Sequence, residues 1–592
     1  MHVLITPLHI MSSLAPSKNL ISQYQRLNQY FNNQKEVKTS IEQVAEALCC
    51  TRRNVNNVLN KMSQQGWLTW LPARGRGKLS QLIFHSPTKA PALQLAMSKA
   101  SEGLLQEAFS LLPNQTDKND LFNYLKTQLG FKNELHGDQL LRMPYHRSLP
   151  NLDPTQATRI TEIHMINQIM DTLVTYDRQN QCIKPNLAHS WKSDEAGTCW
   201  HFYLRPGIKF HHGRLLNCED VKATLNHLKS TPSPFQGLYQ HISKIDCLTP
   251  LSIKIELSSR NFLLLHLLAS HCSSIQPSDL MHQPKFAHQP VGTGPFMVIK
   301  NNEFQLQLDA NLDYFQARAL LDRIEIWFFA DQKLALEQHS DLIISDTSTA
   351  HHDASMRQNS KIEKGYQYLL FNVAKHNSPL QNLRIRRSIR SMLDTTRLIK
   401  ELGGTRAAPA RRLLTEWEAD TQRLMFPVRP RMPMRLQEPL KLVTYDIHME
   451  DAKWIKKSLA NFEIPIQISE LAYTDFANPD NWLDADLVLS GEALDDNLEM
   501  ALYEWFATQR SLRHCMGDEV RQQLDDKLIQ AISLAQKNER MEAFRAMDIF
   551  LQQQLVLLPL YHHQQLLHYG DRVQGLNLNS LGWVDFKDIW FT

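Results

Sequence analysis

The segment TRRNVNNVLNKM, residues Thr51–Met62, contains two residue patterns that decide the character of the N-terminal part of the chain. Its apolar residues follow the i, i+3, i+4, i+7 spacing of a buried helix face: Val55, Val58, Leu59 and Met62. The opposite face carries only cations and amides: Arg52, Arg53, Asn54, Asn56, Asn57, Asn60 and Lys61. Arginine can bond guanine, and asparagine adenine, through two hydrogen bonds, and both reach phosphates, so this face predicts a DNA-reading helix.

A second predicted helix precedes this segment across a tight turn. Ser40 and Gln43 have capping-box spacing, and they begin an apolar stripe 14 residues before the first: Ile41, Val44, Ala45 and Leu48. Cys49 and Cys50 fall in the turn, and Thr51 is the expected cap of the following helix. A further apolar stripe between Leu20 and Phe31 predicts a helix before these two. The arrangement is typical of a helix-turn-helix.

A basic hairpin is predicted after the reading helix. Gly66 is expected to end the helix, and residues 67–70 and 81–84 are the two expected strands. The loop between them alternates glycine with cations, Arg74, Arg76 and Lys78, which allows close approach to phosphates or a minor groove. The alternative is a solvated basic helix beside an ordinary hairpin. The acid-free stretch 47–101 favours a winged helix that binds double-stranded promoter DNA.

The composition of the 592-residue chain predicts several globular domains. Hydrophobic residues make up 43% and charged residues 21%, and the net charge is +3. The basic excess is local, because residues 18–89 hold 11 Lys and Arg against 3 Asp and Glu. The chain contains no run of about 18 apolar residues, so no membrane span is predicted. An export signal would require a cation near the N-terminus, and none precedes Lys18. A cytoplasmic location is therefore expected, with Met1 and Met11 both candidate starts.

The sequence gives weak support to catalysis or to a bound metal. No P-loop, GxGxxG, HExxH or nucleophile elbow occurs, and the eight cysteines form no CxxC pair. His211-His212, His351-His352 and His562-His563 lack a third ligand at useful spacing. We therefore expect no catalytic residue, metal or cofactor, and a protein that is not an enzyme. A hydrolase using the carboxylate pairs Asp484/Asp486 or Asp495/Asp496 is the alternative from another class.

From about residue 138 the sequence alternates short apolar runs with helical patterns, which predicts an α/β fold. The expected strands are 140–145, 200–204, 252–257, 304–308, 324–329, 342–345, 368–372, 441–445, 466–468 and 487–490. Residues 89–137 before them read as a helical connector. The predicted fold class is thus a multidomain chain, an α+β winged helix-turn-helix followed by a large α/β domain.

Motifs in order along residues 138–592 resemble family 5 extracellular solute-binding proteins, which bind the cargo of ABC importers. They include Asn151-Leu152-Asp153-Pro154, WHFYLRPGIKFHHG at 200–213, PVGTGPF at 290–296, the helix pattern 383–399 and residues 582–590. The combination with GWLTW at 66–70, GRGK at 75–78 and LNSLGWVDFK at 578–587 resembles the SgrR-type transcriptional regulators of the sugar-phosphate stress response. This resemblance implies a two-lobed periplasmic-binding-protein-like domain attached to the DNA reader.

The expected domain boundaries follow from these patterns. They are a disordered terminus 1–17, the winged helix 18–88, the connector 89–137, a first solute-binding lobe of 138–365 with 557–592, and a second lobe of 366–556.

The resemblance also implies a ligand site between the lobes. The candidate residues are Tyr145, Arg147, Thr172, Asn372, Arg384, Glu492 and Asp495, with Arg386 as a further cation. In peptide-binding relatives a loop that reads Gly-Trp-Cys-Ala-Asp holds the amino group of the ligand with its aspartate. Gly491 and Asp495 have the same spacing as the first and last residues of that loop, although Glu492 stands in place of the tryptophan. An amine-bearing ligand thus stays open beside the sugar phosphate that the SgrR resemblance implies, which would need Arg or Lys.

The expected function is a DNA-binding regulator, an activator of sugar-phosphate stress genes that senses a small cytoplasmic metabolite and contacts RNA polymerase. The alternative is a binding protein for a peptide or another small molecule, without a regulatory role.

Overall fold

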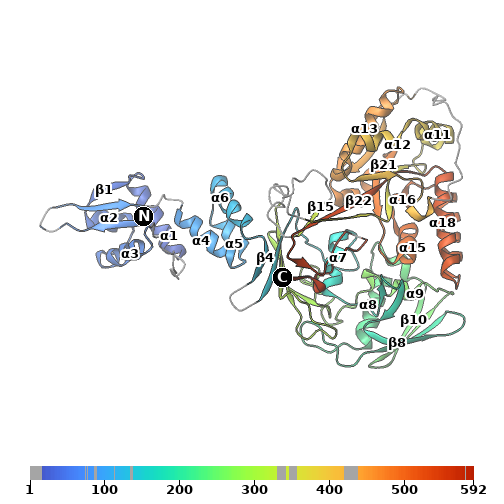
Figure 1. The fold of residues 1–592 in the computed structure, drawn as a ribbon, viewed down its shortest axis with the longest axis horizontal. Coiled ribbons are helices and arrows are strands. Elements are labelled where there is room, and N and C mark those ends of the chain that lie inside the picture. The colour runs from blue at the N-terminus through green and yellow to red at the C-terminus, as the bar shows by residue number, and fades with distance from the viewer. Residues whose placement is uncertain are drawn as a thin grey trace, which may run out of the picture. The chain divides into compact units, whose positions relative to one another are not determined.

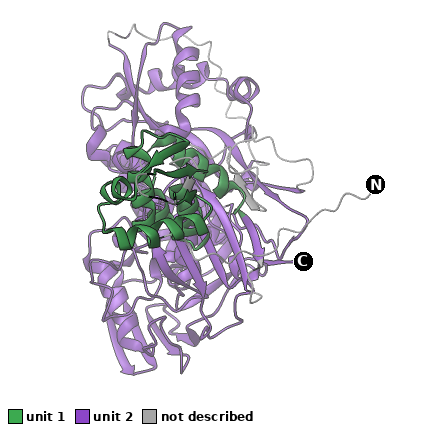
Figure 2. Cartoon of the chain, turned by 90° about the vertical axis from the view of Figure 1, so that its left-hand side faces the viewer, with its two compact units in different colours: residues 1–129 green, residues 130–592 purple. Residues whose placement is uncertain are grey.

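The computed structural model describes residues 17–592 except 74, 76–77, 86–89, 113, 134–137, 330–341, 346–356, 419–435, 437 and 581. The chain forms two compact units, of which the first ends at Leu129 and the second begins at Gly130 (Figure 2). Nearly all of the predicted terminus 1–17 lies outside the described residues.

Unit 1 begins with a winged helix-turn-helix, which confirms the predicted fold. Its elements are α1 (Lys18–Tyr30), β1 (Glu36–Thr39), α2 (Ile41–Ala47), α3 (Arg52–Gln64), β2 (Leu68–Leu71) and β3 (Ser80–Phe84). The strands form an antiparallel sheet in the order β1-β3-β2. Strand β1 was not predicted, because EVKT offers no apolar alternation; it pairs with β3, and the Gln81 amide of β3 donates to the Glu36 carboxylate of β1.

Local chemistry explains where these helices begin and end. Ser40 and Gln43 form the predicted capping box of α2. Thr51 occupies the N-cap position of α3 with extended backbone, as predicted, but its side chain makes no capping hydrogen bond. Cys49 turns the chain between the helices at φ 49°, and Gly66 ends α3 at φ 70°, where a side chain would be strained.

The core of the winged helix forms around Trp67, which is fully buried. Its ring lies 5.3 Å from that of Tyr24, and the Tyr24 hydroxyl donates to the Trp67 carbonyl at 3.3 Å. All four apolar residues predicted on α3 are buried, as is Leu82 of β3. Burial of this face fixes which face of α3 remains exposed.

The predicted connector contributes to both units. Helices α4 (Ala90–Ser101), α5 (Leu105–Ser110) and α6 (Gln115–Lys126) belong to unit 1 and bury Leu95, Leu105 and Leu121. Strand β4 (Gly130–Asn133) pairs with β5 (Gln139–Tyr145) and belongs to unit 2.

Unit 2 contains three main sheets (Figure 1). The five-stranded sheet has the order β12 (Phe296–Asn301), β13 (Gln305–Ala310), β14 (Arg323–Phe328), β5 and β4. The four-stranded sheet has the order β10 (Ile242–Thr249), β11 (Ser252–Leu257), β9 (Cys199–Leu204) and β8 (Ala188–Ser193). Two small hairpins pair β6 (Val174–Asp177) with β7 (Cys182–Pro185), and β23 (Val573–Gln574) with β24 (Trp590–Phe591).

The third sheet is the largest, with the order β15 (Leu342–Ser345), β22 (Leu557–Tyr569), β17 (Gly365–Phe371), β21 (Leu487–Ala493), β19 (Leu440–Tyr445) and β20 (Ile466–Leu471). Strands β16 (Arg357–Ile362) and β18 (Arg406–Pro409) also pair with β22. Every strand predicted from the sequence of unit 2 has its counterpart among these three sheets, which confirms the α/β prediction.

Helices cover the sheets of unit 2. Along the chain, α7 (Ile160–Ile169), α8 (Cys218–Ser230) and α9 (Leu264–Leu267) lie between strands of the first two sheets. The third sheet is accompanied by α11 (Leu383–Met392), α12 (Thr395–Leu402), α13 (Met449–Ala460), α14 (Tyr473–Phe476), α15 (Leu498–Thr508), α16 (Arg510–Cys515), α17 (Asp518–Ile532) and α18 (Lys537–Gln553). One hydrophobic core joins β9 and β11 to α15 and α18, so the segments predicted as two lobes share buried side chains.

The core of the winged helix gives a stability prediction. Leu59→Ala removes a fully buried side chain from α3, and we expect it to lower the free energy of unfolding of unit 1 by about 2–5 kcal/mol. Hydrogen exchange read by mass spectrometry should accelerate in residues 17–84 and stay unchanged in unit 2. Leu71→Ala is the control, because Leu71 is 48% exposed. Equal acceleration by both variants would contradict the packing described above.

Candidate functional site

The polar face of α3 is exposed along its whole length. Arg52, Arg53, Asn54, Asn56, Asn57, Asn60 and Lys61 are all exposed, while the apolar residues between them are buried. Among the described residues, Arg52 alone of these seven has a side-chain partner, an exposed ion pair with Glu42 of α2. Surface pairs of this kind contribute little and exchange readily. The other six side chains are therefore available to bases and phosphates.

The first turn of α3 carries a charge that opposes folding. Arg52 and Arg53 occupy the helix N-terminus, where the helix dipole favours anions, and no acidic residue lies there. Each such cation costs about 0.3–1 kcal/mol relative to a dipole-matched residue. A polyanion placed against this turn would remove that cost.

The wing is only partly described. Lys78 is exposed beside Gly75, which has φ 116°, whereas the predicted contacts Arg74 and Arg76 lie outside the described residues. Strands β2 and β3, which carry the loop, have the register expected of a hairpin.

Two predicted ligand residues lie together at the end of β5. The Tyr145 hydroxyl is 2.5 Å from the Thr161 hydroxyl, and the Arg147 guanidinium lies over the Tyr145 ring at 5.6 Å. Arg147 also donates to both carboxylate oxygens of Glu162, at 2.5 and 2.7 Å. This bidentate pair already satisfies the charge that a phosphate would need from Arg147.

Other predicted ligand residues make internal hydrogen bonds. The Thr172 hydroxyl donates to the Val174 carbonyl at 2.7 Å, and the Asn372 amide donates to the Ala485 carbonyl at 2.9 Å. Both side chains are buried. They hold the ends of β6 and β17 in place, so we leave them out of the site.

The remaining predicted cations lie on α11. Arg384 is exposed, and the side chain of Arg386 is buried against backbone, donating to the carbonyls of Leu380 at 2.6 Å and Gln554 at 3.0 Å. Arg386 thus ties the first turn of α11 to the segment before β22.

The two predicted carboxylates meet a third that the sequence did not indicate. Glu504 of α15 has no hydrogen bond or ion pair to its carboxylate within the described part of the chain. Burial, with smaller contributions from the neighbouring charges of Glu492 and Asp495, raises its pKa to about 8. Burial likewise raises the pKa of Glu492 to about 7, although the Gln509 amide donates to it at 2.8 Å. Neither glutamate forms an ion pair with a cation in the part of the chain that the structure describes.

Asp495 differs from the two glutamates in its access to water. The surrounding protein and the charge of Asp496 raise its pKa, yet the residue is exposed. Asp496 itself lies within 4 Å of three cations, Arg178, Lys361 and Lys364.

Buried donors without partners adjoin these acids. The Tyr368 hydroxyl and the Trp505 indole N–H are both buried, and neither forms a hydrogen bond within the described chain. Their rings lie 6.2 Å apart, and Trp505 lies close enough to Glu492 to favour its charged form. A buried donor without a partner costs free energy, which a water molecule, an ion or a ligand can recover by accepting from it.

Aromatic residues complete this region. Tyr445 and Tyr473 have ring centroids 5.3 Å apart, and both feel the charge of Glu492. The Arg159 guanidinium lies over the Tyr473 ring at 4.1 Å, and the Thr158 and Tyr473 hydroxyls are 3.4 Å apart. Segments more than 300 residues apart therefore meet at Tyr473. No sequence pattern links them, because their proximity depends on the closed fold.

The histidine pairs that were considered as metal ligands have structural partners where they are described. His211 accepts from the Gly292 amide at 3.2 Å and its other ring nitrogen lies 3.0 Å from the Gly294 carbonyl. His562 lies 2.7 Å from the Gly365 carbonyl. His351 and His352 lie outside the described residues. No helix in the described chain has the length and apolarity needed to cross a membrane.

Two protein families match the chain. Bacterial extracellular solute-binding proteins, family 5, match residues 183–423. A domain described as the N-terminus of the sugar transport-related sRNA regulator matches residues 19–135.

Several relatives that match nearly the whole chain are named HTH-type transcriptional regulator SgrR. The relative from Yersinia enterocolitica is 33% identical over 97% of this chain and 98% of its own length. Those from Pectobacterium atrosepticum and Escherichia coli are each 30% identical over 97% of this chain and 99% of their own length.

Solved structures similar to this chain are binding proteins. A Pseudoalteromonas dipeptide-binding protein in complex with Met-Leu has a TM-score of 0.65 at 19% identity, covering 77% of this chain and all of its own. NikA from Brucella suis in complex with Fe(III)-EDTA has a TM-score of 0.64 at 15% identity with the same coverage. At these identities the likeness establishes the fold of unit 2.

The raised pKa of Glu504 predicts a pH-dependent stability. A carboxyl whose pKa is higher folded than unfolded binds more protons when folded, so its contribution is lost as pH rises from about 4.5 through about 8. Glu504→Gln should therefore gain stability over the unchanged protein between pH 5.5 and pH 9, by about 1 kcal/mol or more. Urea unfolding at these pH values measures the difference. Glu539→Gln, at an exposed position of α18, is the control, and an equal pH trend in both variants would refute the burial argument.

Proposed function

The chain belongs to the SgrR family of HTH-type transcriptional regulators, and on that premise we propose that α3 reads promoter DNA while unit 2 responds to a small solute. The protein is a DNA-binding transcriptional regulator with a family 5 solute-binding domain. The observation that carries the proposal is the exposed cation and amide face of α3 on a rigid winged helix. We place its action in the cytoplasm, where promoter DNA is accessible, and assign it no enzymatic activity.

The regulatory output that we propose is activation. Activation of sugar-phosphate stress genes accords with the family name of the N-terminal domain, and contact with RNA polymerase would supply the mechanism. A solute that binds unit 2 can change transcription only if it binds the active form of the protein more tightly or more weakly than the inactive form.

Two ligand classes are distinguished by charge. A sugar phosphate needs a cation, and Arg159 is our candidate, because Arg147 is already paired with Glu162. A small amine would instead bind Glu492 and Glu504 and relieve their mutual repulsion. The two acids favour the amine over the phosphate, because carboxylates attract an ammonium and repel a phosphate.

The DNA contacts give a prediction that separates base reading from phosphate binding. Arg53→Ala should weaken binding to a promoter fragment by about 1–3 kcal/mol if it bonds a base edge, and it should reduce discrimination against unrelated DNA. Lys78→Ala should weaken both DNAs alike and flatten the slope of log K against log salt by about one. Fluorescence anisotropy at several salt concentrations measures both. Unchanged affinity of Arg53→Ala for the promoter would refute the assignment of α3.

Coupling between the units gives a second prediction. A solute that binds unit 2 and regulates through DNA occupancy should shift half-saturation of DNA about 5- to 150-fold, and DNA should shift solute affinity by the same factor. The probes are glucose 6-phosphate and the diamine putrescine, screened by thermal shift and then by DNA titration and transcription in vitro. Arg159→Ala should abolish a response to the phosphate, and Glu504→Gln a response to the amine. If a probe raises the melting temperature but changes neither DNA binding nor transcription, unit 2 binds a solute without regulating the protein.

A further inference from the structure

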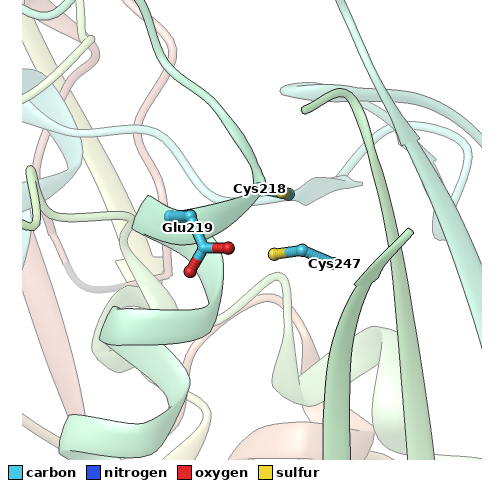
Figure 3. A group of neighbouring side chains, drawn as sticks. All are labelled: Cys218, Glu219 and Cys247. Carbon is cyan, nitrogen blue, oxygen red and sulfur yellow. The ribbon is translucent and has the colours of Figure 1, made fainter. Parts of the chain in front are cut away.

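Two cysteines and a glutamate meet in the four-stranded part of unit 2, away from the acids discussed above. Potential ligand atoms of Cys218, Glu219 and Cys247 all lie within 4.8 Å of one another. Cys218 and Glu219 begin α8, while Cys247 lies on β10. Figure 3 shows the Glu219 carboxylate and the Cys247 sulfur directed toward one another. We propose that these three residues form a binding site for a thiophilic divalent cation such as Zn²⁺.

The backbone holds this group in place without any metal. The Cys218 amide donates to the Pro250 carbonyl at 2.8 Å, which ties the start of α8 to the turn between β10 and β11. Asn217 caps the same helix end by accepting from the Glu219 amide at 2.8 Å. The ligand atoms are therefore presented by elements already fixed to one another, so little order has to be gained on binding.

The donor set selects for a soft metal. Two thiolates with one carboxylate suit Zn²⁺ and disfavour Ca²⁺ and Mg²⁺, which prefer oxygen. Two sulfurs bound to one tetrahedral zinc lie about 3.8 Å apart, given a Zn–S distance of about 2.3 Å. The potential ligand atoms already lie within 4.8 Å of one another, about 1 Å from that spacing at most. Three protein ligands leave the fourth position to water.

The three proposed ligands differ in their exposure to solvent. Cys218 is buried, Cys247 is partly buried, and Glu219 is exposed, so a cation has a route from solvent. Within the described residues no cation forms an ion pair with Glu219. Burial raises the pKa of the Cys247 thiol well above its usual range, and the neighbouring Cys218 and Glu219 raise it further. A bound cation reverses that effect by stabilising the thiolates.

Binding is a proton exchange with a defined balance. One Zn²⁺ forms two Zn–S bonds and one Zn–O bond, and the two thiols release two protons to solvent. No electron is transferred, so the step needs no oxidant. Because two protons leave, the apparent affinity should rise by up to about 100-fold per pH unit while both thiols are protonated.

The test titrates the reduced full-length protein with Co²⁺, then displaces it with Zn²⁺. We expect a thiolate-to-cobalt charge-transfer absorption band that saturates at one equivalent and disappears with one equivalent of Zn²⁺. Cys247→Ser should abolish the band. Cys199→Ser, on β9 of the same sheet, and Cys49→Ser, in the exposed turn of unit 1, should keep it. Absence of the band, or its survival in both Cys247→Ser and Cys218→Ser, overturns the proposal.

Two further measurements guard against misfolding and disulfide formation. Glu219→Gln changes an exposed residue, so it should keep the circular dichroism of the unchanged protein while weakening zinc binding about tenfold or more. Equal zinc affinity in this variant removes Glu219 and with it the three-ligand site. All eight thiols should react with an alkylating reagent once the metal-free reduced protein is unfolded in denaturant, because three of them are buried in the folded chain. A disulfide between Cys218 and Cys247 that persists under reductant would also overturn the proposal.

Discussion

Unit 2 depends on the placement of one strand. Strand β22, Leu557–Tyr569, pairs with β15, β16, β17 and β18, so much of the eight-stranded sheet is completed only when the C-terminal chain returns to it. Its first residues are almost continuously buried, as expected for a strand covered on both faces. These pairings join residues about 150 to 230 positions apart in the sequence. The loop-closure entropy of such contacts is lost before they stabilise anything, so unit 2 must form cooperatively.

The acids of unit 2 fall into two groups, those that form an ion pair and those that do not. Most buried acids have a close cation: Glu325 lies 2.8 Å from Arg142, Glu499 2.6 Å from Arg540 and Asp451 2.9 Å from Arg406. Removing one member of such a pair leaves an uncompensated charge and is strongly destabilising. Glu492 and Glu504 have no such cation among the described residues, although burial acts on both. A bound amine of the kind proposed above would compensate the charge of both.

In the winged helix, the buried face of α3 stabilises the fold while its exposed face costs stability. Its buried face follows ordinary packing around Trp67, whereas its exposed face places arginines against the helix dipole and four asparagines in a helix. Asparagine is a poor helix former because its side chain competes for backbone hydrogen bonds. The core offsets the stability lost on this face, which leaves α3 free to carry the residues that we propose contact DNA.

The sequence alone determined the elements whose signals are local. Helical spacing and capping predicted α2 and α3, Gly66 marked the end of α3, and apolar runs predicted strands of unit 2 as far apart as β5 and β21. Family motifs predicted the solute-binding fold for the same reason, since each motif is a short contiguous segment. The short polar strand β1 has no such signal, because EVKT offers no apolar alternation.

Only the tertiary structure decided which side chains meet. It paired Arg147 with Glu162, fixed Asn372 by internal hydrogen bonds, and brought Glu504 of α15 beside Glu492 of β21. It also placed Cys247 beside Cys218, 29 positions earlier in a sequence without zinc-ligand spacing. Charge compensation and ligand geometry depend on distances of a few ångströms between segments remote in the chain. Those distances are set by sheet register and helix packing, which residue spacing along the sequence does not encode.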